Sequence, residues 1–97
     1  MKKYILTITY NFDADYIIKS FNTENEAIKT LNKYLQDEIE TVKDECEYEP
    51  SVIRWDDLGT NITLVYADGY TDDPLEVASR IYAKEDYAEY RIFEVEI

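Results

Sequence analysis

The chain has 97 residues, of which 45% are hydrophobic, so we expect residues 1–97 to form one folded domain rather than a disordered acidic tail. It contains 22 acidic and 10 basic residues, a net charge of −12 at neutral pH. This charge argues against direct binding to DNA, RNA or anionic lipid, because each of them would repel the chain. The expected partners are basic protein surfaces.

The acidic excess is uneven, and residues typical of catalytic sites are scarce. Residues 1–36 contain four acids and five bases, whereas residues 37–97 contain eighteen acids and five bases. The chain has no histidine, one cysteine and two glycines, which excludes a histidine-based protease triad, a phosphate-binding loop and a dinucleotide fingerprint. A glycosidase pair of carboxylates needs a cleft for which so short a chain has little room. We therefore expect a protein that is not an enzyme and has no cofactor.

The sequence also indicates where the protein is found. The first apolar run, residues 4–10, is too short and too interrupted by threonine for a signal peptide. No stretch approaches the roughly 20 apolar residues that span a membrane. The single cysteine, Cys46, excludes an intramolecular disulfide. We expect a cytoplasmic protein without membrane contact.

Two strands are predicted before residue 22. Residues 4–10 alternate between two faces and are rich in β-branched and aromatic side chains, which is the pattern of a strand. Residues 11–15 have the composition of a turn, and residues 16–21 predict a returning strand. The first 21 residues are therefore expected to form a β-hairpin.

A helix over residues 24–47 is the best-supported element. Thr23 and Glu26 form the sequence pattern of a capping box, and Pro50 follows at a position where a helix cannot continue. Apolar residues recur every three or four positions and lie within a stripe about 80° wide, which must face a core. We expect Leu31, Leu35 and Ile39 to be nearly fully buried and Cys46 to act as a small hydrophobe. The stripe consists of Ile28, Leu31, Leu35, Ile39, Val42 and Cys46.

The second half of the chain predicts three more strands, over residues 52–55, 62–66 and 87–97, with a hairpin loop at 56–61. An N-cap followed by Pro74 favours a short helix over 74–84, although the apolar residues there also alternate as in a strand. The predicted fold is α+β. It has a four- or five-stranded, largely antiparallel sheet with the long helix packed on one face.

The exposed side of this helix carries the first candidate site, which we call the helix ridge: Asp37, Glu40, Asp44 and Glu47. Their spacings of three and four residues put neighbouring carboxylates about 5–6 Å apart, where like charges destabilise a helix. The helix dipole also favours cations, not anions, in this half of the helix. The ridge therefore indicates a surrogate for a phosphate backbone. The alternative is a solvated face of a very soluble protein.

A single helix ridge carries less charge per length than a DNA strand, which has one charge every 3.4 Å. We therefore expect acids from predicted loops to extend the charged surface, namely Asp56, Asp57, Asp72 and Asp73. No acid cluster matches a calcium-loop pattern, so turn acids such as Asp13 and Asp15 are expected to be turn residues and caps, not metal ligands.

The aromatic residues supply a further candidate. Tyrosine is enriched in binding hot spots, and Tyr70 and Tyr87 are flanked by acids of predicted turns. We expect both to be exposed anchors for a partner. We expect Trp55, next to Asp56, to lie in the core.

In size, charge, tyrosine content and order of strands and helix, the whole chain resembles the small acidic proteins encoded by phages and other mobile elements, anti-CRISPR proteins and DNA mimics among them. The resemblance includes no diagnostic motif and transfers no site residues. It implies stoichiometric inhibition, in which an acidic face occupies the positively charged nucleic-acid channel of a CRISPR effector or another host-defence nuclease in a bacterial cytoplasm. The alternative is a small acidic housekeeping interaction module whose charge serves solubility.

Overall fold

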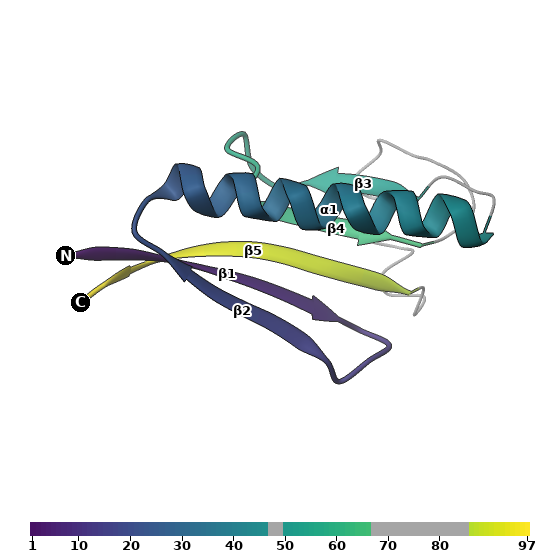
Figure 1. Cartoon of the computed structure of the whole chain (residues 1–97), viewed down its shortest axis with the longest axis horizontal. Helices are drawn as coiled ribbons and strands as arrows, with labels where there is room; N and C mark the ends of the chain where they lie inside the picture. The colour runs from purple at the N-terminus through teal and green to yellow at the C-terminus, as the bar shows by residue number, and fades with distance from the viewer. Residues whose placement is uncertain (47–49, 67–85) are drawn as a thin grey trace.

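The computed structural model describes residues 1–46, 50–66 and 86–97. Figure 1 shows how the helix lies along the strands of the sheet. The element bounds agree with the sequence predictions to within two residues. The elements are β1 (Lys2–Tyr10), β2 (Tyr16–Phe21), α1 (Glu24–Cys46), β3 (Ser51–Arg54), β4 (Asn61–Val65) and β5 (Tyr87–Glu96).

The five strands form one antiparallel sheet in the order β2-β1-β5-β4-β3, with α1 packed against it. This confirms the predicted α+β fold. The longest pairing joins the first and last strands, from Lys2 opposite Glu96 to Tyr10 opposite Ala88. The two termini consequently lie side by side, and the amide of Ile97 donates to the carbonyl of Met1 at 2.8 Å.

Helix α1 begins at Glu24, directly after the capping residue Thr23, as predicted. The hydroxyl oxygen of Thr23 accepts a hydrogen bond from the backbone amide of Glu26 at 3.3 Å, which satisfies one of the amides that the first turn leaves without a partner. Leu31, Leu35 and Val42 are buried as expected. The expectation of near-complete burial for Ile39 was wrong, because this side chain is half-buried.

The orientation of α1 explains that difference. Ala27 is fully buried and Glu38 is half-buried, although neither belongs to the apolar stripe. At 100° per residue both lie on the same side of the stripe, opposite the margin that carries Ile39. The contact face is therefore rotated toward Ala27, which leaves Ile39 at its edge and brings Glu38 close to the sheet.

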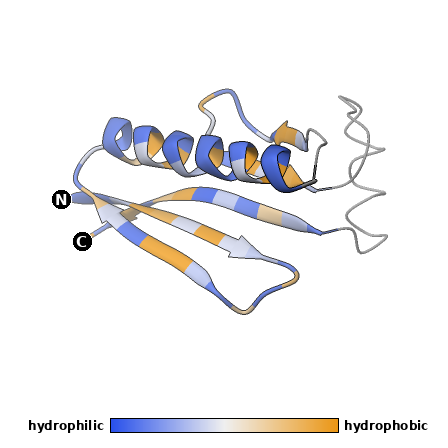
Figure 2. Cartoon of the chain, turned by 45° about the vertical axis from the view of Figure 1, so that its right-hand side comes forward, coloured by the Kyte–Doolittle hydropathy of each residue, from blue (hydrophilic) through white to orange (hydrophobic). Residues whose placement is uncertain are grey.

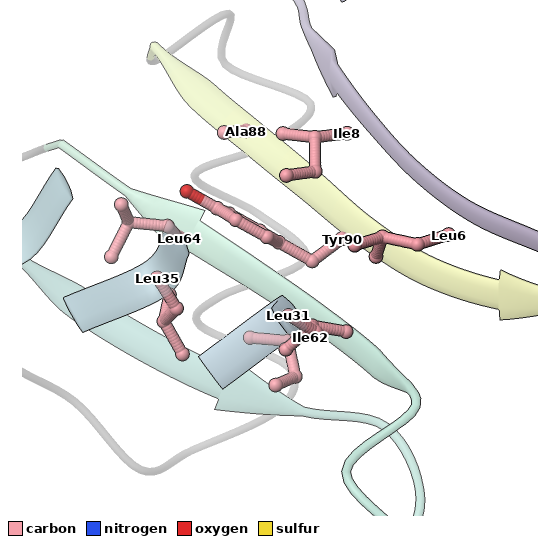
Figure 3. Packing of buried hydrophobic residues seen from close by; sticks show 8 residues of the cluster. All are labelled: Leu6, Ile8, Leu31, Leu35, Ile62, Leu64, Ala88 and Tyr90. Atoms are coloured by element: carbon pink, nitrogen blue, oxygen red, sulfur yellow. The ribbon is translucent and has the colours of Figure 1, made fainter. Parts of the chain in front are cut away.

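The core lies between α1 and the central strands. Figure 3 shows Tyr90 of β5 between Leu35 and Leu64 on one side and Leu6 and Ile8 on the other. The ring of Tyr90 is 1% exposed, so this residue is the largest fully buried side chain of the described core. Alternation along β1, β4 and β5 directs these residues to the helix-covered face. Figure 2 shows the same arrangement in the helix, whose apolar residues turn toward the sheet.

The prediction that Trp55 lies in the core is wrong. Trp55 is 55% exposed and does not lie in the core. Its indole Nε1 donates to the hydroxyl of Thr63 at 2.8 Å, and Thr63 alternates with the core residues Ile62 and Leu64 on β4. Trp55 therefore lies on the face of the sheet that α1 does not cover. The general preference of tryptophan for burial does not indicate which of the two sheet faces the side chain occupies.

Some predictions concern residues outside the described ranges. They are the choice between a helix and a strand for residues 74–84, the exposure of Glu47 and the burial of the Cys46 side chain. Within the described residues, no helix is long and apolar enough to cross a membrane.

Candidate acidic binding surface

The helix ridge is exposed in the part that the structure describes. Asp37, Glu40 and Asp44 all lie on the solvent side of α1. The ion pairs of the described residues join Met1 to Glu96, Lys2 to Glu94 and Arg91 to Glu89, so none of them involves the ridge. Gln36 donates to Glu40 at 3.4 Å, which is a neutral contact. Asp37, Glu40 and Asp44 therefore keep their charge available to a partner.

The sheet brings the β1–β2 turn to the same end as the C-terminal half of α1. Asp13 and Asp15 lie in this turn, and Asp86 precedes β5 beside it, where the amide of Asn11 donates to the carbonyl of Tyr87 at 3.1 Å. We call this the turn end of the molecule. The carboxylate of Asp13 accepts from the amide of Asp15 at 3.1 Å, the turn role expected for it.

A hollow of about 340 Å³ opens at the turn end between the β1–β2 turn and α1. Its wall contains aromatic rings from β1, the turn and β2 together with three carboxylates. Phe12 is 52% exposed and Tyr16 is 66% exposed. The residues that line the hollow are Tyr10, Phe12, Asp13, Asp15, Tyr16, Ile17 and Glu38.

Contacts with neighbouring residues hold several of these side chains in place. The ring of Phe12 packs between those of Tyr10 and Tyr66, with centroid distances of 5.6 and 5.4 Å. The hydroxyl of Tyr66 donates to the carboxylate of Glu38 at 3.0 Å. Glu38 is thus fixed at the boundary between the core and the hollow, and it is a functional candidate that the sequence analysis missed.

Burial, with a further contribution from nearby carboxylates, raises the pKa values of three phenols in this part of the molecule. Burial and then the charge of Glu38 raise the pKa of Tyr66. Burial raises the pKa of Tyr10, followed by the charges of Glu38, Asp13 and Asp15. Burial is also the main cause that raises the pKa of Tyr90. Carboxylates from the helix and the turn therefore act together on Tyr10.

The β3–β4 loop gives its two acids different environments. The carboxylate of Asp56 accepts from the backbone amide and the hydroxyl of Thr60 at 2.9 and 2.6 Å and from the side-chain Nδ2 of Asn61 at 2.7 Å. The hydrogen bond from the Thr60 hydroxyl is the main cause that lowers the pKa of Asp56. Gly59 closes the loop with a φ of 74°, which favours glycine. Asp56 thus organises the loop, whereas Asp57 is exposed.

These loop acids do not extend the helix ridge. Because β1 and β4 both run antiparallel to β5, the start of β4 lies at the same end of the sheet as the start of β1. The β3–β4 loop, which contains Asp56 and Asp57, therefore lies toward the end that holds the chain termini (Figure 1), which we call the terminal end. The structure brings Asp13 and Asp15 to the turn end instead, although the sequence analysis assigned them no binding role.

The candidate tyrosines are only partly described. Tyr87 is half-buried at the start of β5, and its amide donates to the side chain of Asn11 at 2.7 Å. The more exposed aromatic residues of the turn end are Phe12 and Tyr16. Their signal in the sequence was the same one that singled out Tyr70, namely aromatic residues flanking turn acids. Tyr70, Asp72 and Asp73, like Glu47, lie outside the described residues.

No three side chains of the described residues are arranged to hold a metal ion. No protein-family model, curated protein or solved structure matches this chain.

Proposed function

We propose that this protein is a non-enzymatic inhibitor whose acidic surface binds the positively charged nucleic-acid site of another protein, such as a CRISPR effector or another host-defence nuclease. The observation that carries the proposal is the helix ridge. Asp37, Glu40 and Asp44 are exposed, and no described ion pair neutralises them. Asp13 and Asp15 add charge at the same end of the molecule.

The cost of these charges to folding supports a role in binding. Carboxylates three and four residues apart repel one another, and in the C-terminal half of a helix they also oppose its dipole. A basic channel removes both penalties when it covers the ridge. Opposite charges also speed association, and this gain decreases steeply as salt is added.

A charge-neutralised variant tests the proposal. In D37N/E40Q/D44N the three ridge carboxylates that the structure describes are each replaced by an amide of the same shape, so the net charge changes by +3 while the apolar stripe stays intact. Wild-type protein immobilised at low salt should retain nucleic-acid-binding proteins from a bacterial lysate, and both high salt and an added DNA duplex should release them. The variant should lose these proteins.

The matched control is E24Q/E26Q/E96Q, which changes the net charge equally but leaves the ridge unchanged. It should retain the same proteins as the wild type. Equal retention by the ridge variant would contradict the proposal. The ridge would then be a solvated face, as expected for a housekeeping module whose charge serves solubility.

A further inference from the structure

We infer that the hollow at the turn end is a binding site for an arginine side chain of a partner protein. Its wall combines three carboxylates, from Asp13, Asp15 and Glu38, with the rings of Tyr10, Phe12 and Tyr16. This combination recognises a flat organic cation. The ridge residues do not line the hollow, so the inference does not depend on the proposed function.

The chemistry of guanidinium fits both parts of the wall. Its planar, weakly hydrated group stacks on aromatic rings, and its five donors bind carboxylates through paired hydrogen bonds. No described ion pair involves Asp13, Asp15 or Glu38. One oxygen of Asp13 accepts from the amide of Asp15, and its carboxylate retains further lone pairs for a ligand.

Part of the wall is formed before a ligand arrives. Phe12 is packed between Tyr10 and Tyr66, the hydroxyl of Tyr66 holds Glu38, and the β1–β2 turn holds Asp13. A preformed site binds without the cost of ordering its side chains. The raised pKa of Tyr10, due in part to all three carboxylates, is consistent with a negative potential in this space.

The same observations disfavour an inorganic cation. Calcium needs six to eight oxygen ligands at about 2.3–2.6 Å, and magnesium needs an octahedral set. No group of three acidic side chains among the described residues has such a geometry. Exposed aromatic rings add nothing to the binding of a hard metal ion, whereas they contribute directly to the binding of guanidinium.

A titration followed by two-dimensional ¹H–¹⁵N NMR tests the inference with Nα-acetyl-arginine amide as the probe. The shifts of the wild-type protein should be concentrated at residues 10–17 and around Glu38, with millimolar affinity. The citrulline analogue has the same shape without the charge and should cause much smaller shifts. Equal binding of the citrulline analogue, or shifts spread evenly over the acidic surface, would overturn the inference.

Variants locate the site. D13N/D15N keeps a side-chain acceptor for the turn and removes two charges, so it should bind the arginine probe roughly fivefold to tenfold more weakly. D57N/E96Q has the same net charge but is changed at the terminal end, so it should bind within about twofold of the wild type. Equal weakening in both variants would show attraction to net charge and would overturn the site.

One further variant separates this inference from the proposed function. The ridge variant D37N/E40Q/D44N should still bind the arginine probe within about twofold of the wild type. A site that fails in D13N/D15N and persists in the ridge variant supports the hollow, whatever the partner of the ridge. Loss of the localised shifts in the ridge variant as well would overturn the inference.

Discussion

The two ends of the sheet carry acidic residues in different environments. At the terminal end, Asp56 accepts three hydrogen bonds from its own loop, Lys2 pairs with Glu94 at 2.7 Å, and the N-terminal ammonium pairs with Glu96 at 3.4 Å. At the turn end, no described ion pair involves Asp13, Asp15 or the carboxylates of the helix ridge. At the terminal end Asp56, Glu94 and Glu96 are paired within the chain, whereas the carboxylates named at the turn end form no described ion pair and remain available to a partner.

This comparison shows that the number of acids does not identify a binding surface. Asp56 and Asp57 are adjacent in the sequence, yet one organises a loop and the other is exposed. What distinguishes a candidate site is whether the charge is already satisfied within the chain, because a satisfied carboxylate gains little from a partner.

The largest expected effect tests the packing that places the helix at the turn end. Leu35→Ala removes a buried side chain from the core and should lower the free energy of unfolding by about 2–5 kcal/mol, measured by urea denaturation. Ile18 is 60% exposed, so Ile18→Ala is the control and should change stability by less than about 0.5 kcal/mol. Equal stabilities of the two variants would contradict the described helix–sheet packing.

The next effect tests the structural role of acids at the terminal end. Asp56→Ala leaves the Thr60 and Asn61 donors without their acceptor and should cost about 1–2 kcal/mol at neutral pH. The exposed neighbour provides the control, because Asp57→Ala should change stability by less than about 0.5 kcal/mol. If the two alanine variants unfold at the same urea concentration, Asp56 does not organise its loop.

The pH dependence of that effect follows from the lowered pKa of Asp56. A carboxyl with a lowered folded-state pKa contributes stability above its unfolded-state pKa of about 3.9 and loses it as the pH falls through the folded-state pKa. The difference in stability between the wild type and Asp56→Ala should therefore shrink below about pH 4. Denaturation curves from pH 7 to pH 2.5 measure it, and a constant difference would contradict the assignment.

A third prediction concerns the negative potential of the turn end. The raised pKa of Tyr66 means that its phenol stays protonated in the folded state at pH values where an unfolded tyrosine, with a pKa of about 10, ionises. Tyr66 therefore contributes to the stability of the folded state below about pH 10, and this contribution is lost as the pH rises through its folded-state pKa. Glu38→Gln removes one cause of the shift and should move part of the tyrosinate absorbance to lower pH.

The control for this titration is Glu40→Gln, which removes a charge from the solvent side of the same helix. Its tyrosinate absorbance should follow that of the wild type, with the folded state monitored by circular dichroism. A similar displacement in both variants would show a general effect of net charge and not the contact between Glu38 and Tyr66.

The smallest expected effects concern ions. At matched ionic strength, millimolar Mg²⁺ or Ca²⁺ should raise the melting temperature no more than NaCl does, because screening relieves the repulsion along the ridge without a specific site. In D37N/E40Q/D44N the repulsion among these three positions is removed, so the salt dependence should be weaker and the stability at least that of the wild type. A shift confined to one divalent ion would reveal a metal site.

Most of the described fold follows from local patterns. The period of two in residues 4–10 and the 3.6-residue period of the apolar stripe identify a strand and a helix, because each backbone geometry repeats its side-chain directions at a fixed interval. Thr23 similarly identifies the helix start, since its hydroxyl satisfies a free amide of the first turn. The exposure of Asp37, Glu40 and Asp44 follows from the same periodicity.

The candidate site was less predictable, because it joins segments distant in the chain. Nothing local indicates that Glu38 lies beside Asp13 and Tyr66, since that proximity requires the helix to be rotated toward Ala27 and the two hairpins to be joined through β5. The wrong expectations for Ile39 and Trp55 have the same origin. Periodicity gives the approximate side of a helix that is buried, but not how far the helix rotates against the sheet or which sheet face it covers.

The sequence by itself determined the types and bounds of the elements, the acidic character of the chain and the exposure of the helix ridge, because these depend on composition and on the repeat of each backbone geometry. The tertiary structure decided which acids share an end of the molecule and which are satisfied within the chain. The physical reason is that a carboxylate's role depends on the donors and charges within a few ångströms of it. In a sheet with the order β2-β1-β5-β4-β3, those neighbours come from distant parts of the sequence.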